Sequence, residues 1–256
     1  MSSFPWRLIT AELTVLRRNR GMLAWSLIVT IGALLVFFIV PAIQYANDAA
    51  HHQPAGGTNG FGGGVHVLGL IVGPLAAILI GVQAGAGDLS AGVFRDLVST
   101  GRSRITLFVA RVPAALGLLL PLTIASFVAL VLAADLLAGN GPTPSVDLVL
   151  RAGVYILIAQ CATCIVAVGV ASLLGSRTGA LVGLIGWQLI VSRLLATDQA
   201  LGSIRKVLLT TALQRFDPIG APALATPSWA IASAVVIAWA AAFLAAGAWR
   251  TQLIST

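Results

Sequence analysis

Six long runs of apolar residues dominate the hydropathy pattern of this 256-residue chain, and short polar segments separate them. Each run has about the 20 residues that a helix needs to cross a bilayer. Only 9% of the residues are charged, whereas about a quarter are charged in a typical soluble domain. The pattern predicts an all-α polytopic membrane protein. Its single transmembrane domain, 1–256, has six predicted spans, at 22–42, 67–87, 105–137, 150–174, 178–196 and 228–249.

Two of these predicted spans are unusual in length. The fifth, 178–196, is short, and the third, 105–137, is long and contains Pro113 and Pro121. Proline removes a backbone hydrogen bond and crowds the preceding turn, so we expect a kink or a break in the third span. Its first turn, as far as Arg111, is expected to lie at the membrane interface.

An amphipathic segment, 1–21, precedes the first span. Arginines occupy one side of it, and apolar residues recur at helical spacing on the other. This pattern is typical of an interfacial helix that lies on the membrane, although a charged flank that merely orients the first span has a similar composition. The apolar positions are Trp6, Ile9, Leu13 and Leu16.

The connection between the first two spans, 43–66, is rich in glycine and predicts a flexible loop. It contains His51, His52 and His66, whose spacing matches no compact zinc site. We therefore expect solvated histidines here, with zinc binding as the alternative, and we assign no metal ligand in the chain.

The connection before the last span, 197–227, is longer and carries apolar residues on one helical face before three prolines interrupt it. We expect an amphipathic or re-entrant segment at the outer membrane face. A poorly hydrophobic extra span is the alternative. The apolar residues of this face are Leu201, Ile204, Leu208 and Leu213.

Arginine and lysine are distributed unevenly among the connections. If the amino terminus is cytoplasmic, ten of the 15 cations fall on the cytoplasmic side and five on the outer side. The positive-inside rule favours this orientation. We predict a multi-pass protein of the cell membrane with both termini in the cytoplasm. The net charge of +7 then reflects contacts with membrane lipid headgroups rather than with nucleic acid.

Several kinds of chemistry lack the residues they need. The only lysine, Lys206, does not follow glycine, so the chain has no Walker A loop for ATP. No histidine lies inside a predicted span, which argues against an intramembrane protease. Cys161 and Cys164 lie in an apolar run and are expected to be structural. No carboxylate lies deep in a predicted span, and Arg111, Arg151 and Arg193 are near enough to span ends to snorkel. We assign no catalytic residue.

A few polar and small residues do lie inside the spans. Gln83, Gln160 and Gln188 are expected to join helices by hydrogen bonds, or alternatively to line a pathway. Two pairs of glycines, four residues apart, allow helices to approach closely within one chain or in a dimer. These pairs are Gly81 with Gly85 and Gly179 with Gly183.

The stretch 85–111, between the second and third spans, concentrates charge. Six of the 23 formally charged residues fall within it. Apolar residues recur at helical spacing over 88–101, which predicts a short amphipathic helix on the cytoplasmic side. The segment is too small to be a domain, and we expect another protein to bind it. The predicted contact residues are Asp88, Arg95, Asp96, Arg102 and Arg104.

This layout resembles the permease subunit of ABC type-2 exporters over nearly the whole chain. The nearest approach to a motif is Asp88, Gly92, the pair Leu97-Val98, and Ser103-Arg104 at the start of the third span. In the family, glutamate is common where this chain has Asp88, and proline is frequent where it has Gly101.

The resemblance implies that the chain binds no cofactor and that a separate ATP-binding cassette subunit holds ATP and magnesium. That subunit would dock on the 88–101 helix and would drive export of a substrate by a dimer of permeases, either a homodimer or a pseudo-dimer. The substrate cannot be read from these residues, although the apolar interior favours a hydrophobic or amphipathic one. The alternatives are a non-transporting assembly or sensory protein and an intramembrane enzyme.

Overall fold

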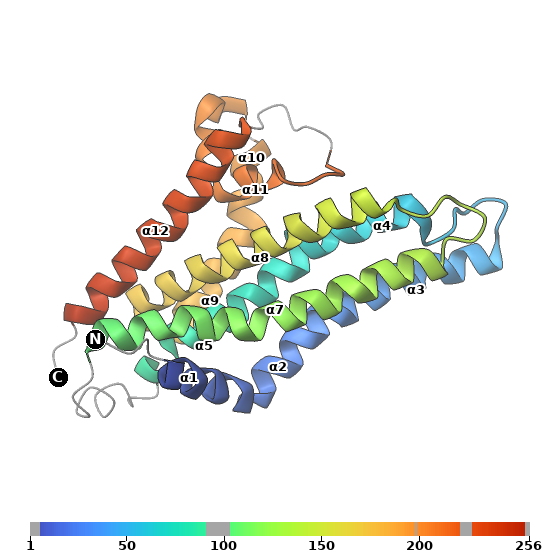
Figure 1. Cartoon of the computed structure of the whole chain (residues 1–256). Helices are drawn as coiled ribbons and strands as arrows, with labels where there is room; N and C mark the ends of the chain where they lie inside the picture. The colour runs from blue at the N-terminus through green and yellow to red at the C-terminus, as the bar shows by residue number, and fades with distance from the viewer. Residues whose placement is uncertain (1–5, 91–102, 198, 221–226, 254–256) are drawn as a thin grey trace.

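The computed structural model describes residues 6–90, 103–197, 199–220 and 227–253, and the helices and turns that they form are shown in Figure 1. Six of these helical segments are long and apolar enough to cross a membrane, as the hydropathy pattern predicted. They are Arg20–Asn47, Gly57–Gly87, Ile105–Leu136, Val146–Leu174, Arg177–Leu195 and Trp229–Leu253.

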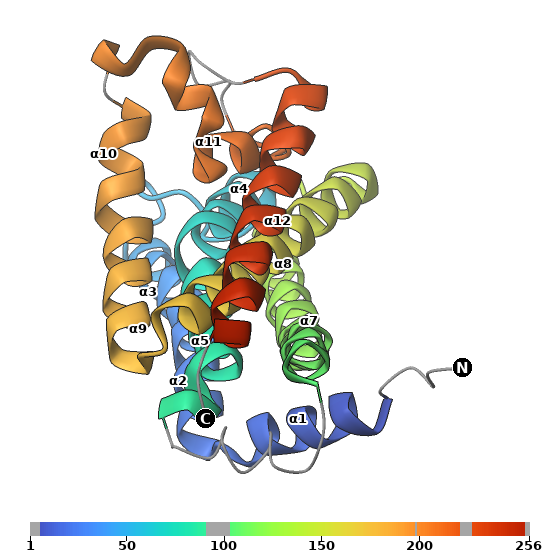
Figure 2. The same ribbon diagram turned by 90° about the vertical axis from the view of Figure 1, so that its left-hand side faces the viewer.

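The amino-terminal helix α1 (Trp6–Arg18) has the amphipathic pattern predicted for it. Part of its apolar face covers protein, whereas Trp6 is 68% exposed. Leu16 is buried, and Ile9 and Leu13 pack against the hydrophobic cluster formed mainly by α5 and α7. Figure 2 shows α1 lying across the ends of these two helices. Amphipathicity alone cannot distinguish an apolar face that meets lipid from one that meets a neighbouring helix.

The first span comprises α2 (Arg20–Leu27), the π turn η1 (Ile28–Gly32) and α3 (Ala33–Asn47). The second comprises α4 (Gly57–Val67), the π turn η2 (Leu68–Val72) and α5 (Gly73–Ser90). A π turn bonds residues five apart and so contains one residue more than an α turn. The amino end of α2 is closed by Asn19, whose side chain accepts a hydrogen bond from the Met22 amide.

The prediction of a flexible loop over 43–66 was wrong at both ends. Helix α3 continues to Asn47, and most of the glycine-rich part forms α4. A Cβ on Gly56 would lie 2.3 Å from the Ala134 carbonyl oxygen, and one on Gly64 would lie 2.1 Å from the Leu130 side chain. These glycines therefore provide room for α7, and the tight packing compensates for their low helix propensity.

The third span, α7 (Arg104–Leu136), begins at Ser103, whose hydroxyl accepts a hydrogen bond from the Thr106 amide. It runs as one unbroken helix through Pro113 and Pro121, so the break that these residues suggested does not occur. The fourth span, α8 (Val146–Leu174), ends at Gly175, which adopts a left-handed conformation with φ of 68°. Much of α8 is buried, as is much of the second span.

The fifth span comprises α9 (Arg177–Gly186), the π turn η3 (Trp187–Val191) and α10 (Ser192–Thr197). Two short helices follow, η4 (Gln199–Val207) and α11 (Leu209–Gln214), before the last span, α12 (Trp229–Leu253). Neither short helix is long enough to cross a bilayer, so the described part of 197–227 contains no additional span. Thr211, Ala212 and Leu213 are buried, which places α11 against the protein interior.

Figures 1 and 2 show that the helices gather at one end of the molecule and diverge at the other. The carboxyl ends of α5 and α12 lie near the amino end of α7 at the gathered end. At the opposite end α12 leans away from α8, and α11 lies between α8, α10 and α12. The most extensive contact between described helices joins α5 to α8.

Candidate functional site

The predicted partner-binding stretch lies at the gathered end of the molecule, but most of it falls outside the described residues. Arg95, Asp96 and Arg102 belong to 91–102, of which the structure gives no description. Asp88 lies in the last turn of α5, and Arg104 is the first residue of α7. The stretch therefore joins the ends of two adjacent spans, and α1 crosses both of them.

Arg111 marks the place where these two spans are joined in the interior. Its side chain is 1% exposed, so the expectation that it snorkels to the interface was wrong. One terminal nitrogen, Nη1, donates a 3.0 Å hydrogen bond to the Gly85 carbonyl oxygen in α5. A cation near the carboxyl end of a helix also interacts favourably with the helix dipole.

The same carbonyl oxygen accepts a second hydrogen bond, of 3.0 Å, from the Ser172 hydroxyl of α8. Gly85 thus connects α5 to both α7 and α8, three residues before Asp88. An ionisable residue inside a membrane domain is expensive to bury and is usually functional.

The glycine pair of the second span lies in the same contact. A Cβ on Gly81 would lie 2.7 Å from the Cys164 carbonyl oxygen, and one on Gly85 would lie 2.5 Å from that of Val168. The pair therefore allows α5 and α8 to touch along their backbones. The other pair differs, because a Cβ on Gly183 would meet nothing within 4 Å and one on Gly179 would meet only Ser176.

The three glutamines have different surroundings. Thr123 of α7 donates a 2.5 Å hydrogen bond to Gln160 Oε1 in α8. The side-chain oxygen of Gln83 and the amide nitrogen of Gln160 are buried, and neither has a hydrogen-bond partner among the described residues. Gln188 lies in η3, and its Nε2 is 3.4 Å from the Leu70 carbonyl oxygen in η2. The π turns of the second and fifth spans thus face each other.

Arg193, in the next helical turn, approaches the same carbonyl oxygen. Its Nη2 is also 3.4 Å from the Leu70 carbonyl oxygen. Arg193 therefore extends toward a neighbouring span, where snorkelling to the interface was expected. The Leu70 carbonyl thus lies within 3.4 Å of two side-chain donors of the fifth span.

An apolar cavity of about 280 Å³ lies beside the π turn η3, in the space between α8, α9 and α12. Trp187, Trp239 and Phe243 form its aromatic wall, in which the Trp239 and Phe243 rings stack with centroids 5.5 Å apart. Trp239 is fixed by a 2.9 Å hydrogen bond from its indole nitrogen to the Val207 carbonyl oxygen. The polar lining groups, which are few, belong to Thr163, Gln188 and Thr210, and none of the described lining side chains is charged.

The histidines and cysteines form no comparable centre among the described residues. His51 Nδ1 lies 2.8 Å from an Asp48 carboxylate oxygen at an exposed position. The described part of the chain contains no group of three side chains suited to hold a metal ion. Cys161 and Cys164 are free thiols on α8, and Cys164 is buried.

Sequence reasoning missed the contacts of Arg111, Ser172 and Leu70, and it missed the aromatic wall of the cavity. One signal was present, because glycines recur every fourth residue at 56, 60 and 64, and again at 69 and 73, and at 81 and 85. Such spacing indicates a helix face that meets another backbone. No protein-family model matches this chain, and no curated protein matches it at a significant level.

Proposed function

We propose that this chain is the permease subunit of an ABC exporter, with ATP bound and hydrolysed by a separate subunit. The observation that carries the proposal is the position of the charged stretch 88–104, which links the ends of α5 and α7. Immediately beyond it, the Gly85 carbonyl is bonded to Arg111 and Ser172 on two neighbouring spans. A partner that moves this stretch would therefore act on three spans together.

The role of each part follows from its chemistry. Asp88, Arg95, Asp96, Arg102 and Arg104 contact the ATP-binding subunit, where charged groups fix register and orientation. ATP and its magnesium ion remain in that subunit. A second permease copy completes the transporter, and Gly179 and Gly183 on the sparsely covered α9 offer a surface for close approach.

The cavity beside α9 and α12 supports a hydrophobic or amphipathic cargo. Its volume of about 280 Å³ is close to the lower limit for small-molecule pockets, about 300 Å³. The described residues of its walls carry no charge, and burying a charged cargo group there without a partner would be unfavourable. Thr163, Gln188 and Thr210 would orient the few polar atoms of such a molecule.

The test of this proposal is coupling between the chain and an ATPase. The chain is co-expressed with the ATP-binding cassette protein whose gene lies nearest to its own, and co-purification and ATPase stimulation are measured in the same membranes. The variants Arg95→Glu and Asp96→Lys should weaken docking about tenfold or more, since breaking a buried charge pair costs about 2–5 kcal/mol. Arg250→Glu, an exposed cation at the end of α12, is the matched control.

The possible results distinguish the permease proposal itself from the role of the charged stretch 88–104 in docking. If the wild-type chain neither binds nor stimulates the ATPase, the permease proposal is wrong. If wild type couples and both reversal variants couple equally well, the permease proposal stands and the charged stretch is not the docking element.

A further inference from the structure

A second pocket, of about 430 Å³, opens where α8 and α12 begin, at the divergent end of the molecule. Its walls come from the first turns of α8, the residues after α11, and Trp229 at the start of α12. Unlike the apolar cavity, it is lined by charged groups, Arg151, Arg215 and Asp217. The proposed transport function uses none of these residues.

Two buried hydrogen-bond donors in this pocket have no partner among the described residues. They are the Tyr155 hydroxyl and the Arg215 Nε. Tyr155 is packed tightly, because a Cβ on Gly69 would lie 3.0 Å from its hydroxyl oxygen. Buried donors are almost always satisfied, and leaving one unpaired is unfavourable. Two such donors in one pocket indicate a ligand that accepts hydrogen bonds.

The charges of the pocket favour an anionic acceptor at Arg215. Its guanidinium lies over the Trp229 ring, 4.9 Å from the ring centroid, and makes no ion pair within the described part of the chain. Arg151 is bound by Asp147 at 2.9 Å. The remaining carboxylate, Asp217, accepts a hydrogen bond from the Ile219 amide in its own turn. Among the described residues, Arg215 is thus a cation of the pocket without an ion pair, although Asp217 belongs to the same lining.

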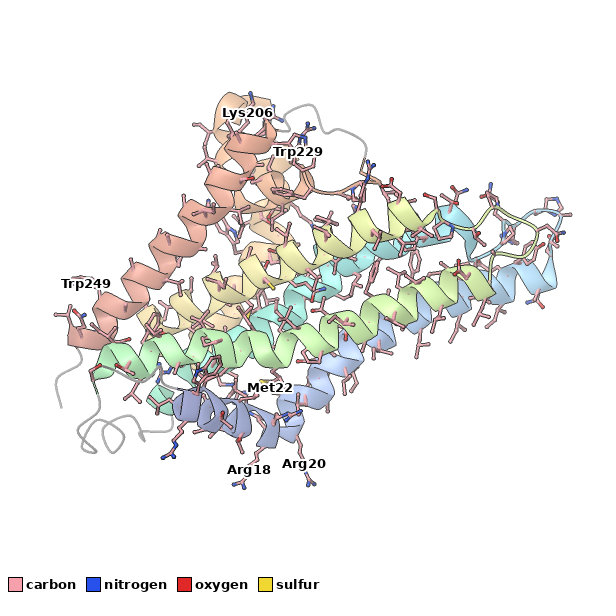
Figure 3. All side chains as sticks on the ribbon, in the orientation of Figure 1. Arg18, Arg20, Met22, Lys206, Trp229 and Trp249 are labelled. Atoms are coloured by element: carbon pink, nitrogen blue, oxygen red, sulfur yellow. The ribbon has the colours of Figure 1, made fainter. Side chains whose placement is uncertain are left out.

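The position of the pocket relative to the membrane suggests where the ligand comes from. Trp229 and Trp249 are exposed and stand near opposite ends of α12, as Figure 3 shows. Twenty residues of helix separate them, or about 30 Å at 1.5 Å per residue, which equals the thickness of a hydrocarbon core. Tryptophan favours the headgroup level, so the pocket beside Trp229 lies at that level.

The rim of the pocket supplies a surface for acyl chains. Leu150 and Val154, one turn apart on α8, are 65% and 57% exposed. A phosphate held between Arg215 and Tyr155 would place its attached chains along these side chains. Guanidinium groups bind phosphate through charge-assisted hydrogen bonds that fit its geometry.

We propose that this pocket binds the phosphate of a phospholipid headgroup, with Arg215 and Tyr155 as the phosphate donors and with Leu150 and Val154 against the acyl chains. The ligand comes from the membrane leaflet on the side where α8 and α12 begin. Arg151 adds positive potential, and Asp217 opposes it. This proposal is independent of the transport function, since it requires neither ATP nor a second subunit.

The test titrates the purified full chain, in an uncharged detergent, with three probes. They are dihexanoyl phosphatidylglycerol, dihexanoylglycerol without the phosphate, and inorganic phosphate. Isothermal titration calorimetry should show that the phospholipid binds at least about tenfold more tightly than either other probe, because only it presents both phosphate and chains.

Variants assign the binding to the named residues. Arg215→Gln should raise the dissociation constant of the phospholipid about tenfold or more, and Tyr155→Phe, which removes only the hydroxyl, about threefold. Asp217→Asn should lower it, since an opposing charge is removed. Lys206→Gln is the matched control, because Lys206 is a cation near the same end of the molecule that does not line the pocket.

Four results overturn the proposal. Equal binding of inorganic phosphate would make this a free-phosphate site, and equal binding of dihexanoylglycerol would exclude recognition of phosphate. No binding of the phospholipid would exclude the site, and unchanged affinity in Arg215→Gln and Tyr155→Phe would place any binding elsewhere. Where Arg215→Gln fails to fold, Tyr155→Phe decides alone, since it keeps the ring that packs against Gly69.

Discussion

Replacing Gly85 by alanine perturbs the backbone carbonyl that connects α5 to α7 and α8. The added Cβ would lie 2.5 Å from the Val168 carbonyl oxygen and 2.8 Å from the Ala171 Cβ. Neither atom can rotate away, because one is backbone and the other is attached directly to it. Ordinary contact begins at 3.4 Å, so α5 must move away from α8 by roughly 1 Å, a displacement that tightly packed interiors resist.

This displacement has two energetic consequences. Overpacking a helix contact costs about 1–3 kcal/mol. The movement also stretches the two 3.0 Å hydrogen bonds to the Gly85 carbonyl, and a bond from a charged donor contributes about 1.5–3 kcal/mol. We expect Gly85→Ala to lower the free energy of unfolding by about 2–4 kcal/mol when the two effects are partly relieved by relaxation.

Two matched variants separate the cost of crowding α8 from the cost of weakening the hydrogen bonds to the Gly85 carbonyl. Gly81→Ala meets the same helix but lies one turn from the shared carbonyl, so its cost should be about 1–3 kcal/mol. Gly183→Ala adds a methyl group where nothing lies within 4 Å, and the higher helix propensity of alanine should raise stability by up to about 1 kcal/mol.

The assay is thermal unfolding of the monomeric fraction in detergent, followed by intrinsic fluorescence for the wild type and the three variants. From most to least stable, the expected order is Gly183→Ala, wild type, Gly81→Ala and Gly85→Ala. Wild-type stability in Gly85→Ala, or a loss in Gly183→Ala as large as that in Gly81→Ala, would refute the packing on which this argument depends.

Three further predictions concern the membrane topology, the hydrogen bonds to the Gly85 carbonyl and the apolar cavity. Single cysteines at Gln53, Ser99 and Ile204, in a background without native cysteines, should label from outside, inside and outside; labelling of position 204 from inside would contradict the six-span arrangement. Ser172→Ala removes one donor to the Gly85 carbonyl and should cost about 0.5–1.5 kcal/mol by thermal unfolding, with no loss if that bond is absent. Thr163→Phe should reduce saturable binding of a neutral hydrophobic fluorophore at least about tenfold by filling the cavity, and unchanged binding would exclude the cavity as its site.

The number and type of the spans could be predicted from sequence because bilayer thickness fixes their length. Hydropathy located five of the six to within about five residues at each end, whereas the second begins ten residues before its predicted start. The glycine-rich stretch was misinterpreted because glycine favours both flexible loops and close helix contacts. A flexible loop and a close helix contact differ in what the glycines pack against, which here is Leu130 and Ala134 of α7. A single sequence does not identify such neighbouring residues.

The misjudgement of Arg111 has a related cause. Its position, seven residues after the start of α7, is compatible with snorkelling if the neighbouring surface is lipid. The neighbour is instead the end of α5, with a carbonyl in hydrogen-bonding range. The lining of the apolar cavity and of the pocket at Arg215 also depends on how neighbouring helices are arranged, including the divergence of α12 from α8. A hydropathy pattern does not predict that arrangement. The charged stretch 88–101 stays a prediction from sequence.

The π turn η2 gives the second span two helical phases. One extra residue shifts all later side chains by about 100°, since an α-helix turns through 3.6 residues. Gly64, before the turn, faces Leu130 of α7, and Gly73, after it, faces Gln160 of α8. Deleting one residue within Leu68–Val72 would restore a uniform helix and turn one half of the span away from its partner. The span consequently tolerates substitutions of similar size far better than changes in length, so its residue count is itself under structural constraint.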